Sequence, residues 1–489
     1  MNRLCGAAVL VTVLAACVTQ NGDAQKAYDR GDYAVAARSY QDLAKRGDTS
    51  AQVRLGLMYK DGQGVAKDNA EAMRWFRAAA DKGNAEGQVN LAYLLLNGSP
   101  SDQAEAVRWL RTAADKGNTQ AQAALGYIYQ KGQGVARDDA EAVRWLRLAS
   151  ENGDPTGRFL LGHAYEQGRG VERSEAEAMR LYRQAAEQGH EVAQYNLGVM
   201  YFEGRGVAKD PAEAARWYRK SADQGYGLAL YNLGVMYERG AGVPQDQAQA
   251  FQWYHKAAEK GVARAQYVLA VMFRHGVGVP KSDEEAVLWF RKAADQGDAD
   301  AQNNLASMLA GNNATAKDYA EALRLFKLAA AQNHAGAQNK LGLMYEKGLG
   351  VSKDYGQALT WYRKSADQGH PGAQSNLGYL YEKGFGVKRD HASAEKWYKL
   401  AADQGHEGAK RALQRMSAEA SAKVSPTKAQ LASAAKVGKC VEALDYTRGQ
   451  CGASGSGAVP VAWSSEQTGK EKSAIQRTAD AIRDLFMMP

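Results

Sequence analysis

The sequence predicts an all-α fold, a tandem array of helix pairs, and three observations lead to that prediction. Glycine recurs with a period of 36 residues along most of the 489-residue chain. Leucine holds one fixed position in every period, and the residue after it is always glycine or alanine. Tryptophan, replaced twice by leucine, holds a second fixed position. The period is marked by Gly47, Gly83, Gly117, Gly153, Gly189, Gly225, Gly261, Gly297, Gly369 and Gly405, with Asn333 at the missing step.

The N-terminal segment has the layout of an export signal. Arg3 is followed by an apolar stretch from Leu4 to Leu14, and Ala15 and Ala16 stand directly before Cys17. An apolar stretch of about eleven residues is shorter than the roughly 20 needed to span a bilayer. Small residues after such a stretch are typical of a cleavage site. We therefore expect a signal peptide over residues 1–16.

Residues 14–17, Leu-Ala-Ala-Cys, resemble the bacterial lipobox. The resemblance implies that Cys17 is acylated and becomes the first residue of the mature chain, with residues 17–23 as a lipid-anchored tether. Because Val18 is not acidic, the resemblance further implies an outer-membrane location facing the periplasm. The alternative interpretation is a plain secretory signal in which the cysteine is incidental.

Residues 24–46 predict a divergent helical pair that caps the array at its N-terminal end. They lack the glycine loop of the later units and carry Gly31-Asp32-Tyr33 at the expected turn. Ten repeats follow, and the stretch 409–416 continues the first-helix pattern with more charged residues, as expected of a terminal capping helix. Repeats and capping helix together occupy residues 47–416.

Each unit predicts two helices joined by a glycine loop. Apolar residues at helical spacing, such as Ala193, Leu197 and Met200, define the first helix. A Gly-x-Gly-Val loop, as at residues 62–65, follows in eight of the ten units and turns the chain through positive φ angles. The second helix begins at a capping pair and carries tryptophan and alanine on its packing face. An exposed tryptophan ladder for stacking on sugars or bases is the alternative for these tryptophans. The capping pairs are Asp68 with Glu71, Asp138 with Glu141, Asp210 with Glu213 and Asp318 with Glu321.

The repeated pattern is similar to that of the SEL-one-like repeat family, which is related to the tetratricopeptide repeats. It reads Ala-x-x-x-Leu-Gly-x-Met-Tyr, Gly-x-Gly-Val, Asp-x-x-x-Ala and Trp-x-x-x-Ala-Ala, and it extends over residues 47–404. The resemblance implies a right-handed α/α superhelical solenoid of antiparallel helix pairs. It also implies an adaptor that holds other proteins on a concave face.

Residues 417–489 depart from the repeat. A Ser/Ala/Lys-rich stretch predicts a linker or a short helix. Cys440 and Cys451 are compatible with a disulfide that closes a small loop in an exported chain, and two free thiols are the alternative. Apolar residues between Ile475 and Phe486 predict a terminal amphipathic helix that folds back on the solenoid, docks a partner or touches the membrane.

Composition and motif content argue against nucleic-acid binding and catalysis. The 62 basic and 54 acidic residues give a net charge of +8, mixed along every repeat. His190, His334, His370 and His406 share one repeat position, and no two histidines have the i, i+4 spacing of a helical zinc site. The glycine loops lack the ending of a phosphate-binding loop. We expect no catalytic residue, metal or cofactor.

We therefore expect a non-enzymatic envelope scaffold that binds one or more envelope proteins on the concave face of its first helices. An outer-membrane secretion or polysaccharide-export assembly is the more specific hypothesis. Alternatives are a cell-wall or glycan-binding module and a β-lactamase-like envelope hydrolase. The hydrolase is suggested by a cysteine-rich branch of the family, whereas the repeats here hold no cysteine. The side chains predicted to bind the partner are Tyr195, Asn196, Tyr231, Asn232, Tyr267, Asn303 and Asn304.

Overall fold

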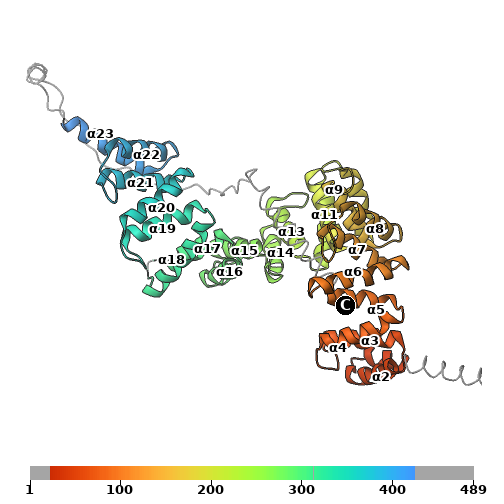
Figure 1. Cartoon of the computed structure of the whole chain (residues 1–489). Coiled ribbons are helices and arrows are strands. Elements are labelled where there is room, and N and C mark those ends of the chain that lie inside the picture. The colour runs from red at the N-terminus through yellow and green to blue at the C-terminus, as the bar shows by residue number, and fades with distance from the viewer. Residues whose placement is uncertain (1–21, 312, 424–489) are drawn as a thin grey trace, which may run out of the picture. The chain divides into compact units, whose positions relative to one another are not determined.

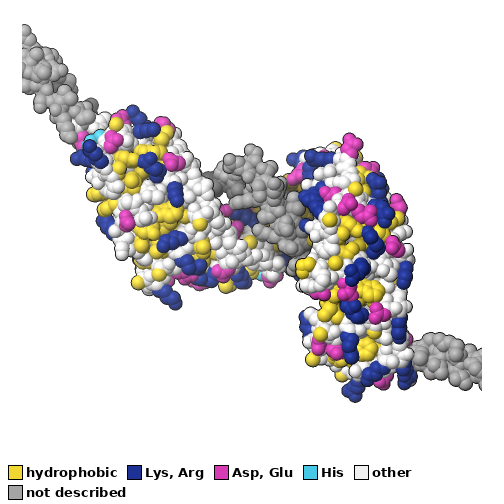
Figure 2. Space-filling view, viewed as in Figure 1, with side chains coloured by type: hydrophobic (Ala, Val, Ile, Leu, Met, Phe, Trp, Pro, Cys, Tyr) yellow, Lys and Arg dark blue, Asp and Glu magenta, His cyan; other side chains and the backbone are white. Residues whose placement is uncertain are grey.

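The computed structural model describes residues 22–311 and 313–423, and these residues form two compact units. The described part of the first unit is residues 22–229, and that of the second is residues 230–423. All regular structure in these ranges is helical (Figure 1). Basic and acidic side chains are interspersed over the visible surface of each unit (Figure 2). The signal peptide, Cys17, Cys440, Cys451 and the terminal amphipathic helix all lie outside the described residues.

The helices of the first unit follow a helical segment at residues 22–29. They are α2 (Tyr33–Lys45), α3 (Thr49–Asp61), α4 (Asn69–Asp81), α5 (Ala85–Leu95), α6 (Pro100–Asp115), α7 (Thr119–Lys131), α8 (Asp139–Glu151), α9 (Pro155–Gln167), α10 (Glu175–Glu187), α11 (Glu191–Glu203) and α12 (Pro211–Asp223). Helix α13 (Gly227–Arg239) includes the boundary between the units.

The second unit continues with ten helices in its described part. They are α14 (Gln247–Glu259), α15 (Ala263–His275), α16 (Asp283–Asp295), α17 (Ala299–Leu309), α18 (Ala316–Ala331), α19 (Ala335–Lys347), α20 (Tyr355–Asp367), α21 (Pro371–Lys383), α22 (His391–Asp403) and α23 (Glu407–Lys423). We call the odd-numbered helices α3 to α21 the first helices, and the even-numbered helices α4 to α22 the second helices.

Consecutive helices pack against each other throughout each unit. A first helix packs on the second helix of its own repeat, and that helix packs on the first helix of the next repeat. The predicted fold class, an α/α superhelical solenoid of antiparallel helix pairs, is therefore confirmed for each unit. In the first unit the backbones of α3 and α5 and of α7 and α9 also approach closely, whereas second helices of successive repeats meet through long side chains, as in the ion pair of Arg77 with Glu105. This asymmetry indicates that the first helices lie on the inner side of that stack.

Residues at the ends of each helix determine where it begins and ends. The Asp68 carboxylate accepts hydrogen bonds from the backbone N–H groups of Ala70 and Glu71, which caps α4 as predicted. Gly62 ends α3 with a φ of 75°, a left-handed conformation that favours glycine.

The capping prediction was wrong for Asp318. Helix α18 begins at Ala316, and its N-cap is Thr315, which forms a capping box with Asp318. The eighth repeat lacks the Gly-x-Gly-Val loop. Its second helix therefore starts earlier than the loop-containing repeats suggest, and Asp318 occupies the third helical position instead of the cap.

Alanine, aromatic and leucine side chains form the core. Trp145 is 2% exposed and Trp289 is 6% exposed, so these indoles are buried between helices and are not a surface ladder. The glycine after the fixed leucine allows a first helix to approach its partner closely. A Cβ atom at Gly198 would lie 2.7 Å from the Tyr218 ring.

Both ends of the described region carry helices beyond the repeats. At the N-terminal end, Ala24, Ala27, Tyr40 and Leu43 are buried in one cluster that also includes Leu55 of α3. At the other end, α23 extends to residue 423, past the predicted limit of 416. No helix in the described ranges is both long enough and apolar enough to cross a membrane.

Candidate protein-binding face

Within each unit, first helices of successive repeats lie side by side and form a surface, which we call the first-helix face. In the second unit, Arg264 of α15 forms an ion pair with Asp300 of α17 at 2.8 Å. Farther along the same unit, the Asn376 side chain of α21 donates a hydrogen bond to Asn339 Oδ1 of α19 at 3.0 Å. Direct packing of α7 on α9 joins first helices in the first unit.

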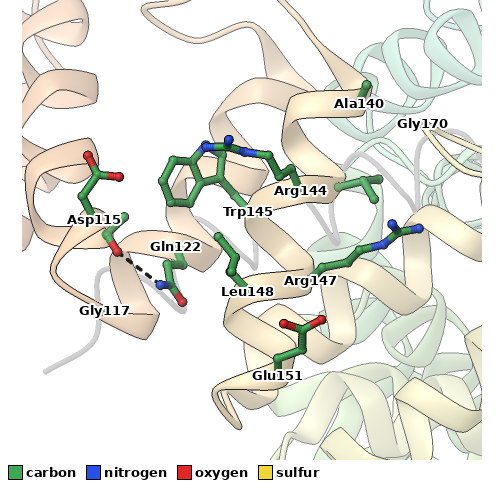
Figure 3. A pocket seen from close by; sticks show the side chains of 12 residues that line it. Asp115, Gly117, Gln122, Ala140, Arg144, Trp145, Arg147, Leu148, Glu151 and Gly170 are labelled. Atoms are coloured by element: carbon green, nitrogen blue, oxygen red, sulfur yellow. Dashed lines mark hydrogen bonds between the residues drawn. The ribbon is translucent and has the colours of Figure 1, made fainter.

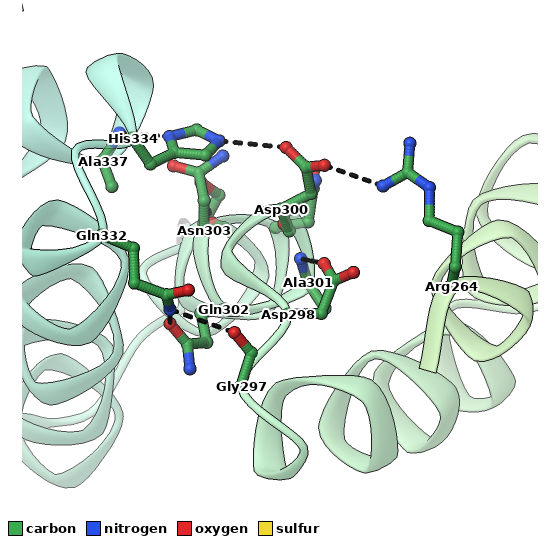
Figure 4. A network of polar contacts seen from close by, with 12 residues as sticks. Arg264, Gly297, Asp298, Asp300, Ala301, Gln302, Asn303, Gln332, His334 and Ala337 are labelled. Carbon is green, nitrogen blue, oxygen red and sulfur yellow. Dashed lines mark hydrogen bonds and ion pairs between the residues drawn. The ribbon is translucent and has the colours of Figure 1, made fainter. Parts of the chain in front are cut away.

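A ladder of glutamine side chains holds neighbouring repeats together beneath this face. Gln302 Nε2 donates to the Ala294 carbonyl at 3.2 Å, and Gln332 Nε2 donates to Gln302 Oε1 and to the Gly297 carbonyl, each at 3.0 Å (Figure 4). Gln302 is buried, and a buried amide is costly to leave unpaired, so its bonds to the Ala294 carbonyl and to Gln332, which is exposed, fix the spacing of the repeats. The same glutamine pair recurs as Gln194 with Gln224, Gln266 with Gln296, Gln338 with Gln368 and Gln374 with Gln404.

Buried tyrosines of the second helices donate hydrogen bonds to glutamates of the first helices. Tyr182 donates to Glu166 at 2.8 Å and Tyr362 donates to Glu346 at 2.6 Å. Burial, together with the neighbouring carboxylate, raises the pKa of both tyrosines. The phenols therefore stay protonated at neutral pH, and these glutamates serve as structural acceptors.

The regularly spaced histidines cap the first helices. His334 Nδ1 accepts a hydrogen bond from the Ala337 N–H at 3.0 Å, so its ring proton sits on Nε2, 3.2 Å from Asp300 Oδ1 (Figure 4). The hydrogen bond from His334, together with the pairing to Arg264, lowers the pKa of Asp300 to about 2. His190, His370 and His406 cap their helices in the same way. The repeat spacing predicted a structural role for these histidines, but not capping, because histidine is not among the residues usually found at an N-cap.

The predicted partner-binding tyrosines all lie on first helices and are partly buried. The Tyr195 ring packs 5.7 Å from that of Tyr218, and the Tyr231 ring packs 5.6 Å from that of Tyr254. The Arg264 guanidinium lies 4.6 Å from the Tyr267 ring centroid. Each tyrosine therefore leaves only part of its side chain on the surface.

The predicted asparagines are also partly buried on first helices. Asn304 donates to the Asp300 carbonyl and accepts from Arg274, and Asn196 is hydrogen-bonded to Tyr182. Asn303 Oδ1 is buried without a hydrogen-bond partner among the described residues. Asn232 lies on α13. Partner binding by these tyrosines and asparagines stays a prediction.

The sequence reasoning missed three aromatic side chains of the ninth and tenth repeats. Tyr355, Tyr379 and Phe385 form one contiguous cluster. Phe385 occupies the variable position of a Gly-x-Gly-Val loop, which in the other seven such loops is never aromatic. That single departure from the repeat was the available signal.

A groove of about 660 Å³ lies along α8 in the first unit (Figure 3). Trp145 and Leu148 supply its apolar part, and Asp115, Arg147 and Glu151 supply charge. Its charged side chains do not converge on one point in Figure 3. Within residues 22–311 and 313–423, no group of three or more His, Cys, Asp or Glu side chains could hold a metal ion.

Comparison with known proteins identifies ten consecutive Sel1 repeats, at residues 49–84, 85–118, 119–154, 155–190, 192–226, 227–262, 263–298, 299–334, 335–370 and 371–406. A protective antigen of uropathogenic Escherichia coli with an SLR fold is 34% identical, over 84% of this chain and 99% of that one, with a TM-score of 0.44. A Sel1 repeat protein from Oxalobacter formigenes is 31% identical, over 50% of this chain and 96% of that one, also with a TM-score of 0.44. No curated protein matched.

Proposed function

The chain belongs to the Sel1-repeat family, whose helical repeats are protein–protein interaction modules, and from that premise we propose that it is an envelope scaffold. In this proposal the first-helix face holds one or more envelope proteins, and an acylated Cys17 keeps the chain at the outer membrane, facing the periplasm. The scaffold would serve an outer-membrane secretion or polysaccharide-export assembly.

The first-helix face is the observation that supports this proposal most directly. Stacked repeats create extended surfaces of this type, and binding such surfaces to other proteins is their general physical use. Several polar groups beneath the face are already paired with each other, as in the Gln302–Gln332 ladder and the Tyr362–Glu346 bond. The surface is therefore preorganised, which lowers the entropic cost of binding a partner.

Capture of the partner in living cells tests the proposal. The full acylated chain is expressed in its own organism and cross-linked, and the captured proteins are identified by mass spectrometry. We expect one or a few envelope proteins, with less capture when Tyr195, Tyr231 and Tyr267 are replaced by alanine. Because these rings pack against neighbouring aromatic residues, the variant is compared only after circular dichroism shows unchanged helicity. No specific protein, under conditions that capture a control complex, would refute the scaffold.

The membrane anchor has its own test. Cys17→Ser removes the thiol that would be acylated, so the variant is expected to lose labelled-palmitate incorporation and to move from the membrane fraction to the soluble periplasmic fraction. A plain secretory signal would instead leave the wild-type chain soluble and unlabelled.

The two alternative functions make different predictions. A glycan-binding module should change its tryptophan fluorescence when cell-wall fragments are added, although buried indoles such as Trp145 limit direct stacking on sugar. An envelope hydrolase should turn over β-lactams and lose that activity through a single substitution.

A further inference from the structure

Six basic and aromatic side chains of the ninth and tenth repeats form a candidate binding surface. Lys340 and Lys347 lie on α19, Lys353 in the loop before α20, Tyr355 on α20, Tyr379 on α21 and Phe385 in the loop after α21. We call this surface the basic–aromatic patch. It consists of Lys340, Lys347, Lys353, Tyr355, Tyr379 and Phe385.

The aromatic half of the patch is a compact cluster with one exposed ring. Tyr355 and Phe385 stack with ring centroids 4.6 Å apart and an interplanar angle of 16°. Tyr379 meets Phe385 edge to face at 5.9 Å, and Tyr379 is 37% exposed. A large aromatic side chain left this exposed beside a second ring offers an anchor for an apolar side chain of a partner.

Phe385 is a local departure from the repeat, whereas Tyr379 has the aromatic equivalents Tyr93 and Tyr127 and Tyr355 has the equivalent Tyr319. The loop position of Phe385 is Gln63, Gln133, Arg169, Arg205, Ala241, Val277 or Leu349 in the other loops of this type. All these loops end a first helix with the same left-handed glycine, so the loop conformation does not call for an aromatic residue. Tyr355 and Phe385 pack against the core of these repeats, whereas Tyr379 leaves an exposed ring beside them that a partner can contact.

The three lysines of the patch form no ion pair with a carboxylate of the described residues, although Asp354 is exposed directly beside Lys353. Lys340 and Lys347 are two helical turns apart on one side of α19, are exposed, and form no ion pair with any described residue. Lys353 lies 4.6 Å from the Tyr355 ring centroid, and a hydrogen bond to Tyr355 raises the pKa of this lysine. All three side chains therefore carry a positive charge at neutral pH.

The nearby carboxylates are committed to structural contacts. Glu346 accepts from Tyr362, and Asp354 caps α20 through the N–H groups of Gly356 and Gln357. Glu382, farther along α21, is only 5% exposed and is bound by Arg415, Lys383 and Tyr398. The patch thus exposes three lysines against one carboxylate, that of Asp354, next to an apolar anchor.

We propose that the basic–aromatic patch binds an acidic peptide segment of a partner protein, with carboxylates on the lysines and one aromatic or large aliphatic side chain against Tyr379 and Phe385. Electrostatic attraction increases the association rate of such a segment, and the aromatic contact provides most of the retention. This rests on the proposed function, because it specifies the partner chemistry of the same first-helix face.

Peptide binding to the full chain tests the patch. The probe is a fluorescein-labelled peptide of alternating glutamate and glycine with one central phenylalanine, followed by fluorescence anisotropy at low salt. Its glutamine-for-glutamate and glycine-for-phenylalanine versions serve as comparison probes. We expect binding of the acidic phenylalanine peptide, weaker binding of each comparison peptide, and loss of affinity as salt is added.

Charge reversal locates the binding. The variant Lys340→Glu, Lys347→Glu, Lys353→Glu should bind the acidic peptide at least about tenfold more weakly. The matched control reverses Lys260, Lys327 and Lys396, which are exposed and unpaired in the described structure and lie at or on second helices of the same unit. This control should bind nearly as the wild type does. All six positions are exposed, so both variants should fold.

A single aromatic substitution completes the test. Tyr379→Ser should weaken binding of the phenylalanine peptide but not of its glycine version, whereas Tyr33→Ser, at an equally exposed tyrosine of the first unit, should change neither. Equal binding of the acidic and glutamine peptides, or equal loss in the two charge variants, would overturn the assignment. Cross-linking in cells distinguishes failure of the patch proposal from failure of the scaffold proposal. If the chain does not bind the acidic peptide but still captures envelope proteins in cells, the result contradicts the patch proposal and leaves the scaffold proposal standing.

Discussion

Replacing Gly342 with alanine should destabilise the ninth repeat, against the usual effect of this substitution in a helix. Gly342 lies within α19, where alanine is normally better than glycine by about 1 kcal/mol. A Cβ atom there, however, would lie 2.6 Å from Cδ1 of Tyr362, a ring that is fully buried. The neighbouring ring cannot move freely, because its hydroxyl group donates to Glu346 at 2.6 Å.

The expected magnitude follows from these opposing effects. Overpacking in a close-packed interior costs about 1–3 kcal/mol. Displacement of Tyr362 also weakens a hydrogen bond to a charged acceptor, which contributes about 1.5–3 kcal/mol. After subtraction of the helix-propensity gain, we expect a net loss of about 2 kcal/mol in the free energy of unfolding.

Hydrogen exchange measured by mass spectrometry is the appropriate assay, because repeat arrays often do not unfold in a single step. Faster exchange should be confined to α19, α20 and their immediate neighbours. Combining the change with Tyr362→Phe should relieve part of the loss, since Ala270 already faces Phe290 at the equivalent positions of the seventh repeat. Slower exchange in Gly342→Ala than in the wild type would show that helix propensity dominates and would refute the packing argument.

Three further predictions concern the polar contacts. Burial lowers the pKa of His190 from 6.5 to about 4, so the folded state disfavours the protonated ring. The free energy of unfolding should therefore fall by roughly 3 kcal/mol as the pH is lowered from 6.5 to about 4. His190→Asn keeps a capping side chain and should flatten that pH dependence in urea unfolding; parallel curves would contradict this. Gln338→Ala removes three side-chain hydrogen bonds, to Ala330, Asn333 and Gln368, and should cost about 2 kcal/mol. The loss should appear as faster exchange at the junction of the eighth and ninth repeats, and unchanged exchange would show that the ladder is dispensable. Arg264→Met should raise the pKa of Asp300 from about 2 toward its ordinary value, measured by carboxyl NMR titration, and an unmoved pKa would mean that His334 alone sets it.

Much of the fold could be predicted because short sequence patterns within each repeat mark where its helices begin and end. The fixed leucine and its following small residue mark the first helix, the glycine loop marks its end, and Asp68 and its equivalents mark most starts of the second helix. The prediction that Asp318 is an N-cap was wrong because the sequence does not distinguish a capping aspartate from an aspartate at the third helical position. Only the hydrogen bond from its own N–H to Thr315 separates the two.

The contacts between helices could not be predicted in the same way. Tyr362 and Glu346 are 16 residues apart, and Gln338 and Gln368 are 30 apart, so no helical spacing pairs them. The predicted face residues illustrate the same limit. Tyr195 and Tyr231 do lie on first helices, but aromatic neighbours that sequence alone could not place take up part of each ring.

Site-specific photo-cross-linking in cells tests the central claim, that the first-helix face holds the partner protein. A photoreactive amino acid is placed at Glu86 or Lys340, exposed on first helices, and at Arg108 or Lys327, exposed on second helices. The scaffold account predicts that a defined envelope protein is captured from one or both first-helix positions and from neither second-helix position. Capture of the same protein mainly from the second-helix positions, or equally from all four, would contradict it.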